Sequence, residues 1–423
     1  MRPSWFATAS FCVAAAAQCD PTWSAGSSLA GADGRVRALA LWDSDGPGPR
    51  PACVVSGGDF SLTGSVFADR VAAYDLATRE WIAFFPPGTE GSIRALAVLP
   101  NGDLVAGGVF TAIGGTAAAN VAVFRNGGWQ PLGVGIAGEV RALLPLPNGD
   151  LVVGGTFLSA GGVPASCVAR WDGAQWSGVG GGVGGSTGSF LVPVGAYALA
   201  RAPNGDLLVG GAFSSAGSVP AANLARWDGA VWSELGGGVA GASLSPIVQT
   251  IRPLANGTIL VGGDFTTAGG TIVGNLAVWT GAGWFGQAAG SGLLFEGSQV
   301  RAAVQTADGA LLAGGAFPQV SANGDLWAGG AFPQVGAAAA RHVARRPAGS
   351  NTWTALGSGI DRGNLVDALL ELPNGDVLVA GDFFGAGGLD VANLAVWDGA
   401  AWSAIGGCAA TPPTALTGQA RRA

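Results

Sequence analysis

Short apolar runs recur along most of the chain, and residues that favour turns separate them. In one copy of the pattern, Val140 to Gly180, four apolar runs alternate with connections that contain glycine, proline or aspartate. No segment keeps its apolar residues at helical spacing, and short runs between turn signals are typical of β-strands. Each copy therefore predicts four short strands joined by three connections.

A compact polar segment separates the first two strands of a copy. Pro100 ends the predicted strand 93–99, and Asn101 and Gly102 follow it. Because both residues tolerate positive φ, we predict a two-residue hairpin that leads into a second strand, 104–110. The pair of glycines inside that second strand would let a neighbouring sheet approach closely.

A double glycine followed by phenylalanine marks each copy and gives a count of seven, with alanine in place of the first glycine in the last copy. The marks are Gly57-Gly58 with Phe60, Gly107-Gly108 with Phe110, Gly154-Gly155 with Phe157, Gly210-Gly211 with Phe213, Gly262-Gly263 with Phe265, Gly314-Gly315 with Phe317, and Ala380-Gly381 with Phe383. Their spacing of about 50 residues lies in the range of propeller blades. A small tandem duplication near 309–335 lengthens the sixth copy, and we interpret it as an insertion in that blade.

The repeats predict an all-β fold, namely a seven-bladed β-propeller of four-stranded antiparallel blades. A blade that is apolar on both faces cannot bury them alone, so blades stack around an axis. Recurring tryptophan pairs would fill the space between blades. These pairs are Trp171 and Trp176, Trp227 and Trp232, Trp279 and Trp284, and Trp397 and Trp402.

The chain divides into three parts. Residues 1–17 read as a secretory signal peptide, because Arg2 precedes an apolar run that ends in small residues at Ala17. Residues 18–407 form the predicted propeller domain, and 408–423 a short flexible tail. Lipidation of Cys19 is an alternative to simple secretion. No later segment has the long apolar run of a membrane helix, so we expect a secreted or cell-surface monomer.

Composition narrows the choice of partner. The 423 residues carry a net charge of −7, and only 11% of them are charged. Nucleic acid is excluded as a partner, because phosphate binding needs clustered lysine and arginine. The chain has 75 glycines, but its 15 tryptophans recur at regular spacing and argue against disorder.

The five cysteines show no spacing typical of a metal site. Cys12 lies in the predicted signal peptide. Cys19 and Cys408 lie at the two ends of the repeat array, and an oxidising compartment would permit a disulfide that closes the ring. Cys53 and Cys167 fall in repeats that are not neighbours, so we expect two buried thiols.

Hydrophobic residues, a double glycine and two spaced aromatic residues together resemble the kelch motif. The resemblance is best in the first copy, where Tyr74 and Asp75 precede Trp81. The fuller pattern, NGDLxVGGxFxxAGGxxAxNxAxWDGxxWxxLG, is similar to extracellular repeat propellers of bacteria and to the propeller region of fungal cortical bud-site-selection markers. It covers about Trp23 to Gly407. The resemblance implies the fold and says little about activity, because propellers host many functions.

Enzymatic function finds little support. Galactose oxidase shares the kelch-type propeller, but its copper-radical chemistry needs several histidine and tyrosine ligands, whereas this chain has one histidine, His342, and two tyrosines. His342 occupies a slot at the start of the third strand, where we expect a polar side chain that bonds the backbone. Other copies fill that slot with Asn120, Asn223, Asn275 and Asn393. No hydrolase, zinc, phosphate-loop or EF-hand motif stands in a convincing context.

One slot near the start of each first strand collects polar side chains. It holds Arg37, Arg94, Arg141, Tyr197, Gln249, Arg301 and Asp367. Because first strands line the channel of a propeller, we expect a ring at one mouth. A two-residue hairpin would place the residue after the double glycine directly opposite. We predict a binding site formed by Arg37, Arg94, Arg141, Arg301, Asp59, Asp264, Asp367 and Asp382.

In the seventh copy this register would set Asp367 opposite Asp382. Like charges directly opposite are unfavourable, so another group should offset them. We favour Arg37, which closure of the ring would bring next to the seventh blade. A bound Ca²⁺ is the alternative, given hard oxygen ligands. Paired carboxylates also suggest glycoside hydrolysis, which nothing else in the sequence supports.

The two faces of the predicted ring should differ. The Asn-Gly turns fall on one face, whereas the longer connections 180–196, 236–247 and 288–298 fall on the other, beside the mouth. Binding residues tend to lie on loops held by a rigid scaffold. We therefore predict a non-catalytic scaffold that binds a protein or a glycan at the loop-rich face. An extracellular hydrolase using Asp367 and Asp382, and a structural module of a cell envelope, are the alternatives.

Overall fold

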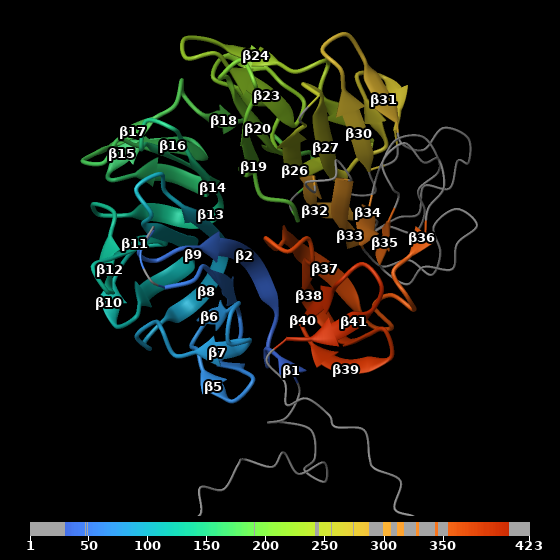
Figure 1. Ribbon diagram of the computed structural model, residues 1–423. Helices are drawn as coiled ribbons and strands as arrows, with labels where there is room; N and C mark the ends of the chain where they lie inside the picture. The colour runs from blue at the N-terminus through green and yellow to red at the C-terminus, as the bar shows by residue number, and fades with distance from the viewer. Residues whose placement is uncertain are drawn as a thin grey trace, which may run out of the picture.

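The computed structural model describes residues 30–46, 48, 50–189, 191–241, 245–254, 256–273, 275–286, 299–305, 311–316, 327–329, 343–345 and 354–405. Within these residues all regular elements are β-strands (Figure 1). In this part of the chain, no helix has the length and apolar character needed to cross a membrane.

Most of the strands form four-stranded antiparallel sheets, which we name in chain order. Sheet A is β2 (Val36–Trp42), β3 (Cys53–Gly58), β6 (Val71–Asp75) and β7 (Glu80–Ile82); sheet B is β8 (Glu90–Val98), β9 (Leu104–Ile113), β11 (Val121–Arg125) and β12 (Gly128–Pro131). Sheet C is β13 (Ile136–Pro145), β14 (Leu151–Ala160), β16 (Val168–Trp171) and β17 (Trp176–Gly178); sheet D is β19 (Gly195–Arg201), β20 (Leu207–Ala212), β23 (Leu224–Trp227) and β24 (Trp232–Glu234). Sheet E is β26 (Ile247–Pro253), β27 (Ile259–Asp264), β30 (Leu276–Trp279) and β31 (Trp284–Gly286); sheet G is β37 (Arg362–Glu371), β38 (Val377–Ala386), β40 (Leu394–Trp397) and β41 (Trp402–Ala404).

Sheet F lies between sheets E and G in the chain and contains the tandem duplication. It consists of β32 (Gln299–Gln305), β33 (Leu311–Ala316), β34 (Trp327–Gly329), β35 (Val343–Arg345) and β36 (Thr354–Ala355). The two copies of the duplicated segment supply β33 and β34, which pair in parallel within one sheet. Among the described residues, the second copy therefore adds a strand to sheet F.

Very short strands extend several sheets or pair with one another. They are β1 (Ala30–Gly31), β4 (Leu62–Thr63), β5 (Val66–Phe67), β10 (Thr116–Ala117), β15 (Val163–Pro164), β18 (Val183–Gly184), β21 (Ser215–Ala216), β22 (Val219–Pro220), β25 (Val239–Ala240), β28 (Thr267–Ala268), β29 (Thr271–Ile272) and β39 (Leu389–Ala392). Apart from β1, which precedes sheet A, they belong to the connections between second and third strands and to those that enter sheets D and E.

The sheets stand around a central axis with their first strands innermost (Figure 1). The first strands follow one another in the order β2, β8, β13, β19, β26, β32 and β37, and β37 in turn contacts β2. Apolar clusters fill the space between successive sheets; one of them joins Ile93 and Ala106 of sheet B to Val55 and Ala73 of sheet A. The structure confirms the predicted all-β, four-stranded antiparallel unit.

The turn between first and second strands differs from the predicted two-residue hairpin. The Gly102 N–H donates to the Leu99 carbonyl at 2.9 Å, and the Leu99 N–H donates to the Asp103 carbonyl at 2.8 Å, so the loop has three residues. Gly102 takes a φ of +88°, whereas Asn101 is not among the residues with positive φ. Pro100 favours the first position of a type I turn, which then needs one left-handed residue to rejoin the ladder.

The two residues of the double glycine have different structural roles. A Cβ on the first glycine, Gly57, would lie 2.6 Å from Ile93 of the next sheet, which confirms the expected close approach between sheets. A Cβ on the second glycine, Gly58, would overlap the Arg35 carbonyl oxygen of its own sheet. The second glycine therefore accommodates an irregularity in the first strand, described below.

The tryptophan pairs lie between sheets, as predicted. The rings of Trp171 and Trp176 are 5.2 Å apart. The Trp176 indole N–H donates to the Leu132 carbonyl, at 2.8 Å, in the connection that leaves sheet B. Trp232, Trp284 and Trp402 make the same bond to Gly180, Gly236 and Leu356, at 2.9, 2.7 and 2.6 Å.

The asparagine slot at the start of the third strand links sheets B, D and G to the sheet that follows each of them. Asn120 has a φ of +66°, and its Oδ1 accepts a hydrogen bond from the Phe110 N–H at 2.9 Å. Its Nδ2 donates to the Ile136 carbonyl of sheet C at 2.8 Å. Cys167 holds the same slot in sheet C with a φ of +63°. The sequence prediction for His342 lies outside the described residues.

The two ends of the described chain meet without a covalent bond. β1 pairs in parallel with β39, and Ala30 and Gly31 lie opposite Val391 and Ala392. Asn393 Nδ2 donates to the Ala32 carbonyl at 2.9 Å. This hydrogen bond repeats between the last and first sheets the link that Asn120 makes between sheets B and C. The predicted Cys19–Cys408 disulfide lies outside the described residues.

Candidate functional site

Every residue of the predicted ring is the extra residue of a β-bulge. In sheet B, Ile93 pairs with Gly108 and Ala95 with Gly107, so Arg94 has no partner in the ladder. The same shift occurs at Arg37, Arg141, Tyr197, Gln249, Arg301 and Asp367. A bulge re-aims its side chain, and the second glycine leaves room for the distorted strand.

The seven bulge residues line one cavity of about 180 Å³, which we call the mouth cavity. Its lining consists of Arg37, Arg94, Arg141, Tyr197, Gln249, Arg301 and Asp367. The sequence pattern therefore located the side chains that meet at the axis, although it did not reveal the bulge that brings them there. Their function as a binding site remains a prediction.

Asp367 is held by arginines of two neighbouring sheets. Arg35 Nη2 donates to Asp367 Oδ1 at 2.6 Å, and Arg35 Nε bonds Oδ2. Arg301 Nη1 approaches Asp367 Oδ1 at 3.5 Å. Burial lowers the pKa of Arg35, but the hydrogen bonds and charge of Asp367 outweigh burial and raise that pKa above its ordinary value.

This arrangement corrects the predicted opposition of two carboxylates. Leu365, not Asp367, lies opposite Asp382, because the three-residue loop and the bulge shift the register. The charge from the first sheet that offsets Asp367 belongs to Arg35, whereas Arg37 pairs with Asp59. The calcium alternative loses its basis, since it required the opposed pair.

Arg37 and Asp59 form a second ion pair in sheet A. Arg37 Nε donates to Asp59 Oδ2 at 2.7 Å, and Ser92 of sheet B donates its hydroxyl to Asp59 Oδ1. Burial of the Asp59 carboxyl raises its pKa, but these hydrogen bonds and the charges of Arg37 and Arg94 bring the pKa below its ordinary value. Asp59 is therefore a carboxylate at neutral pH.

Glu139 links two arginines of the mouth cavity and was not predicted. Its Oε1 lies 2.8 Å from Arg94 Nε, and its Oε2 accepts a hydrogen bond from Arg141 Nη2 at 2.9 Å. Burial lowers the pKa of Arg94, and the positive charges of Arg37 and Arg141 act in the same direction, whereas the charge of Glu139 opposes them. Glu139 and Arg35 share one sequence signal, since each stands two residues before a bulge residue.

Tyr197 supplies the aromatic side of the mouth cavity. The Arg141 guanidinium lies 4.5 Å from the centre of its ring, a cation–π contact. The Tyr197 hydroxyl donates to the Pro193 carbonyl at 2.5 Å. Burial raises the pKa of Tyr197 to about 12, although Arg141 acts in the opposite direction. The phenol is therefore neutral at neutral pH.

Three predicted site residues, Asp59, Asp264 and Asp382, do not line the mouth cavity, although Asp59 pairs with Arg37, which does. Asp264 is buried opposite Ile247 in sheet E, and Asp382 is exposed opposite Leu365 in sheet G. Within the described residues, no group of three histidine, cysteine, aspartate or glutamate side chains is arranged to hold a metal ion. The chemistry that the cavity lining offers is charge and hydrogen bonding from arginine, tyrosine and glutamine.

The two cysteines inside the described residues are free and buried, as predicted. Burial raises the pKa of the Cys53 thiol to about 11, and burial also raises the pKa of Cys167. Both thiols are protonated at neutral pH, and low thiolate content makes a cysteine a poor nucleophile. Neither cysteine lines the mouth cavity.

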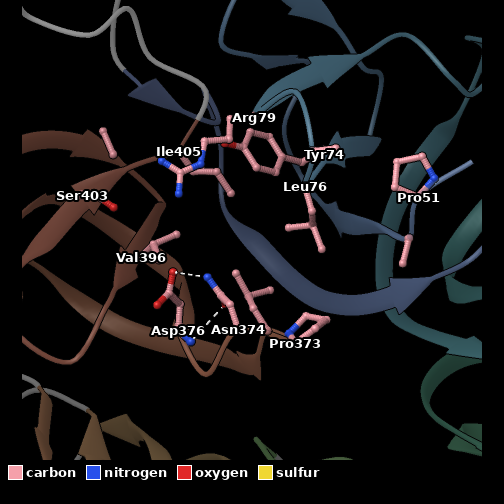
Figure 2. Close-up of a pocket in the computed structure, with 14 residues that line it drawn as sticks. Pro51, Tyr74, Leu76, Arg79, Pro373, Asn374, Asp376, Val396, Ser403 and Ile405 are labelled. Atoms are coloured by element: carbon pink, nitrogen blue, oxygen red, sulfur yellow. Dashed lines mark hydrogen bonds between the residues drawn. The ribbon is translucent and has the colours of Figure 1, made fainter.

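A second cavity lies at the junction of sheets A and G, and we call it the junction cavity (Figure 2). Its volume is about 470 Å³, and its apolar lining includes Tyr74, Leu76, Val396 and Ile405. It opens on the face of the tight turns, since the β37–β38 turn that ends in Asp376 forms part of its wall. A cavity of about 910 Å³ lies between sheets A and B.

Solved structures match this chain with low sequence identity and with TM-scores below 0.5. The extracellular domain of the putative hybrid two-component system BT3049 from B. thetaiotaomicron matches with 11% identity and a TM-score of 0.48, over 88% of this chain and 40% of that one. Virginiamycin B lyase from Staphylococcus aureus, an inactive variant with quinupristin, matches with 10% identity and a TM-score of 0.46, over 84% and 94%. YCF48 bound to D1 peptide matches with 11% identity and a TM-score of 0.45, over 84% and 91%.

The chain spans 38 to 40% of the length of the Bacteroides extracellular domains that it matches. Comparison with curated protein sequences finds no match. Two repeats, residues 146–171 and 202–227, match a family described as a domain of unknown function (DUF5122) with a β-propeller fold. Each segment runs from the turn before the second strand to the end of the third, in sheets C and D. These two repeats are thus similar to a β-propeller family.

Proposed function

We propose that the chain is a secreted, non-catalytic, seven-bladed β-propeller that binds a protein or a glycan at the face of the mouth cavity. Sheets A to G each supply one first strand, and β2 contacts β37, which supports the blade count. The predicted signal peptide, residues 1–17, supports export. We propose a monomer with no nucleic-acid partner.

The convergence of the bulge residues carries this proposal. Different sheets direct polar side chains into one cavity by the same irregularity, repeated at the same slot. A stacked core requires no such ring, because apolar residues alone would close the axis. A preorganised set of arginines held by carboxylates is suited to recognition, because little side-chain entropy remains to be lost on binding.

Long connections lie beside the mouth cavity. Val192, in the connection that enters sheet D, packs on Tyr197 and Ile247. Ser245, in the connection that enters sheet E, donates its hydroxyl to the Thr187 carbonyl at 2.5 Å. These two loops therefore support each other at the rim, where a ligand would contact them.

The charges favour binding over hydrolysis. Asp367 is the one carboxylate among the residues that line the mouth cavity, and Arg35 binds both of its oxygens. Glycoside hydrolysis uses two carboxyl groups on either side of the scissile bond. Asp382 is exposed and lies opposite Leu365, so it does not complete such a pair on the ladder.

A glycan array printed with neutral, uronate-bearing and sulfated saccharides, together with a peptide array, tests the proposal. We expect the full chain to bind a subset of spots, and Arg94→Gln with Arg141→Gln to reduce those signals at least tenfold while circular dichroism shows that the protein remains folded. Arg252→Gln is the matched control, because Arg252 is exposed on β26 and does not line the mouth cavity. Unchanged signals in the double variant would place binding elsewhere, and empty arrays would contradict the proposal.

A further inference from the structure

In several sheets the turn before the second strand carries an aspartate whose carboxylate is oriented by an asparagine. Asn148 Nδ2 donates to Asp150 Oδ2 at 2.5 Å in sheet C, and Asn204 Nδ2 donates to Asp206 Oδ2 at 2.6 Å in sheet D. The same bond, from Asn374 to Asp376 in sheet G, measures 2.7 Å. An asparagine amide thus orients the three aspartate carboxylates in the same way.

In sheets C and D an arginine of the third strand covers this carboxylate. Arg170 lies opposite Val152, and its Nη2 is 2.5 Å from Asp150 Oδ2. Arg226 occupies the same register in sheet D and pairs with Asp206. Both aspartates are buried beneath their arginines, at 5% and 8% exposure.

Sheet G keeps the aspartate but lacks the arginine. Val396 stands opposite Leu378, which is the register that Arg170 and Arg226 hold in their sheets. Among the described residues, Asn374 alone donates a hydrogen bond to the side chain of Asp376, and no ion pair reaches it. Asp376 is correspondingly less buried than Asp150.

The space left by the missing arginine is the junction cavity. Figure 2 shows Val396 above Asp376 on the wall formed by sheet G, with Leu76 and Tyr74 of sheet A across from them. The cavity thus has an apolar body with a carboxylate at one end. Arg79 lies at the other end in the same view.

We propose that the junction cavity binds the side chain of an arginine from a partner polypeptide, with its guanidinium on Asp376 and its methylene stem on Val396 and Leu76. Planar guanidinium groups match carboxylates with two parallel hydrogen bonds. The incoming side chain takes the place that Arg170 and Arg226 occupy in sheets C and D. The positive charge of Arg79 would repel a second cation, so the cavity accepts a single guanidinium group.

This site is independent of the mouth cavity. Asp376 lies in the tight turn between β37 and β38, whereas Asp367 occupies the bulge near the start of β37, toward the other face. The proposal therefore adds a binding function to the face of the tight turns, whereas the sequence analysis predicted binding at the loop-rich face. Failure of one proposal leaves the other standing.

The test uses propylguanidine, the arginine side chain without its backbone, and the neutral isostere propylurea. Ligand-observed NMR on the full chain measures both affinities. We expect propylguanidine to bind with a Kd of about 1 mM, as befits a ligand of a few heavy atoms, and propylurea to bind at least tenfold more weakly. Arg94→Gln with Arg141→Gln should leave both values unchanged.

Two variants test the position of the cation. Asp376→Asn should weaken propylguanidine at least tenfold, because it removes the charge and keeps the shape. Val396→Arg should supply the missing arginine internally, abolish propylguanidine binding and raise the melting temperature. Asp206→Asn is the matched control, since Arg226 already occupies that carboxylate, and it should not change the affinity.

Equal affinities for propylguanidine and propylurea would overturn the proposal, as would undiminished propylguanidine binding to Asp376→Asn. If Val396→Arg fails to fold, the Asp376→Asn variant still decides the question, because the substitution is isosteric and lies at a half-exposed position. Retained binding by a folded Val396→Arg protein would also contradict the proposed place of the cation.

Discussion

Arg35 and Asp367 form an ion pair across the junction where the first sheet meets the last, although 332 residues separate them in the chain. The Arg35 guanidinium contacts both carboxylate oxygens, with Nη2 at 2.6 Å from Oδ1. The side chain of Asp367 is only 7% exposed, and that of Arg35 is 22% exposed. The pair therefore joins the two ends of the ring at the edge of the mouth cavity, which Asp367 lines.

Asp367→Asn should destabilise the protein by about 2 kcal/mol, because it leaves Arg35 and Arg301 partly buried without their counter-ion. The shift in the urea unfolding midpoint measures the effect. Asp390→Asn breaks the Arg362–Asp390 pair, whose side chains are 55% and 69% exposed, and should change stability by less than about 0.5 kcal/mol. Equal losses of stability in both variants would contradict the contribution of Asp367 to closure of the ring.

Gly155→Ala should destabilise the protein by about 1–3 kcal/mol, the usual cost of inserting a methyl group into a packed site. The new Cβ would overlap the Glu139 carbonyl oxygen, at the bulge that carries Arg141. Thermal unfolding followed by circular dichroism measures the loss. Gly128→Ala is the control, since nothing lies within 4 Å of its Cβ position and its φ is not positive. A Gly155→Ala protein as stable as this control would show that the bulge relaxes without cost.

The repeated pattern predicted the strands, the tryptophan contacts and the ring of side chains at the axis, because each depends on local periodicity. The predicted pairing of Asp367 with Asp382 was wrong, and the reason is also local. Pro100 and its equivalents lengthen the loop to three residues, and the bulge then displaces one residue from the ladder. Because every copy carries the same bulge, comparison of the copies does not reveal that the register is offset by one residue.

The ion-pair partners of the bulge residues depend on how the first and last sheets meet, and the sequence pattern does not encode that geometry. Arg35 and Glu139 stand two residues before bulge residues, on the same side of the strand, and most copies have a different residue there. Which of two nearby arginines reaches Asp367 is decided by the geometry of the junction between first and last sheets. Sequence reasoning placed the neighbouring sheet correctly and chose Arg37 in place of Arg35.

Cys167→Asn should stabilise the protein by about 1–2 kcal/mol. Cys167 has a φ of +63° in the slot that holds asparagine in sheets B, D, E and G. Asparagine tolerates this backbone conformation, and it would accept from the Phe157 N–H as Asn120 does from Phe110, so two hydrogen bonds become available. Differential scanning calorimetry measures the gain.

Cys167→Ser serves as the control for that substitution. It also removes the thiol, but its side chain is shorter than asparagine and has no amide group to bridge two sheets. We expect no stabilisation from serine. A gain of equal size in both variants would mean that loss of the buried thiol, and not the amide link, raises the stability.

Tyr197 should titrate at about pH 12 instead of its ordinary 10.0, because burial disfavours the phenolate. In a Tyr74→Phe background, the ultraviolet absorbance of the phenolate reports Tyr197 alone. Arg141→Gln should raise the midpoint further, since the positive charge of Arg141 favours the ionised form. A midpoint near 10 would contradict the buried environment of the ring.

The same pKa shift makes stability depend on pH. The folded-state pKa of Tyr197 lies above the unfolded value, so its contribution is complete below pH 10 and is lost as pH rises toward 12. In that window the unfolded chain releases the phenol proton while the folded chain keeps it. The free energy of unfolding should fall by up to about 3 kcal/mol. Urea unfolding at successive pH values should show this loss in the Tyr74→Phe protein, and Tyr197→Phe should remove that part of the dependence.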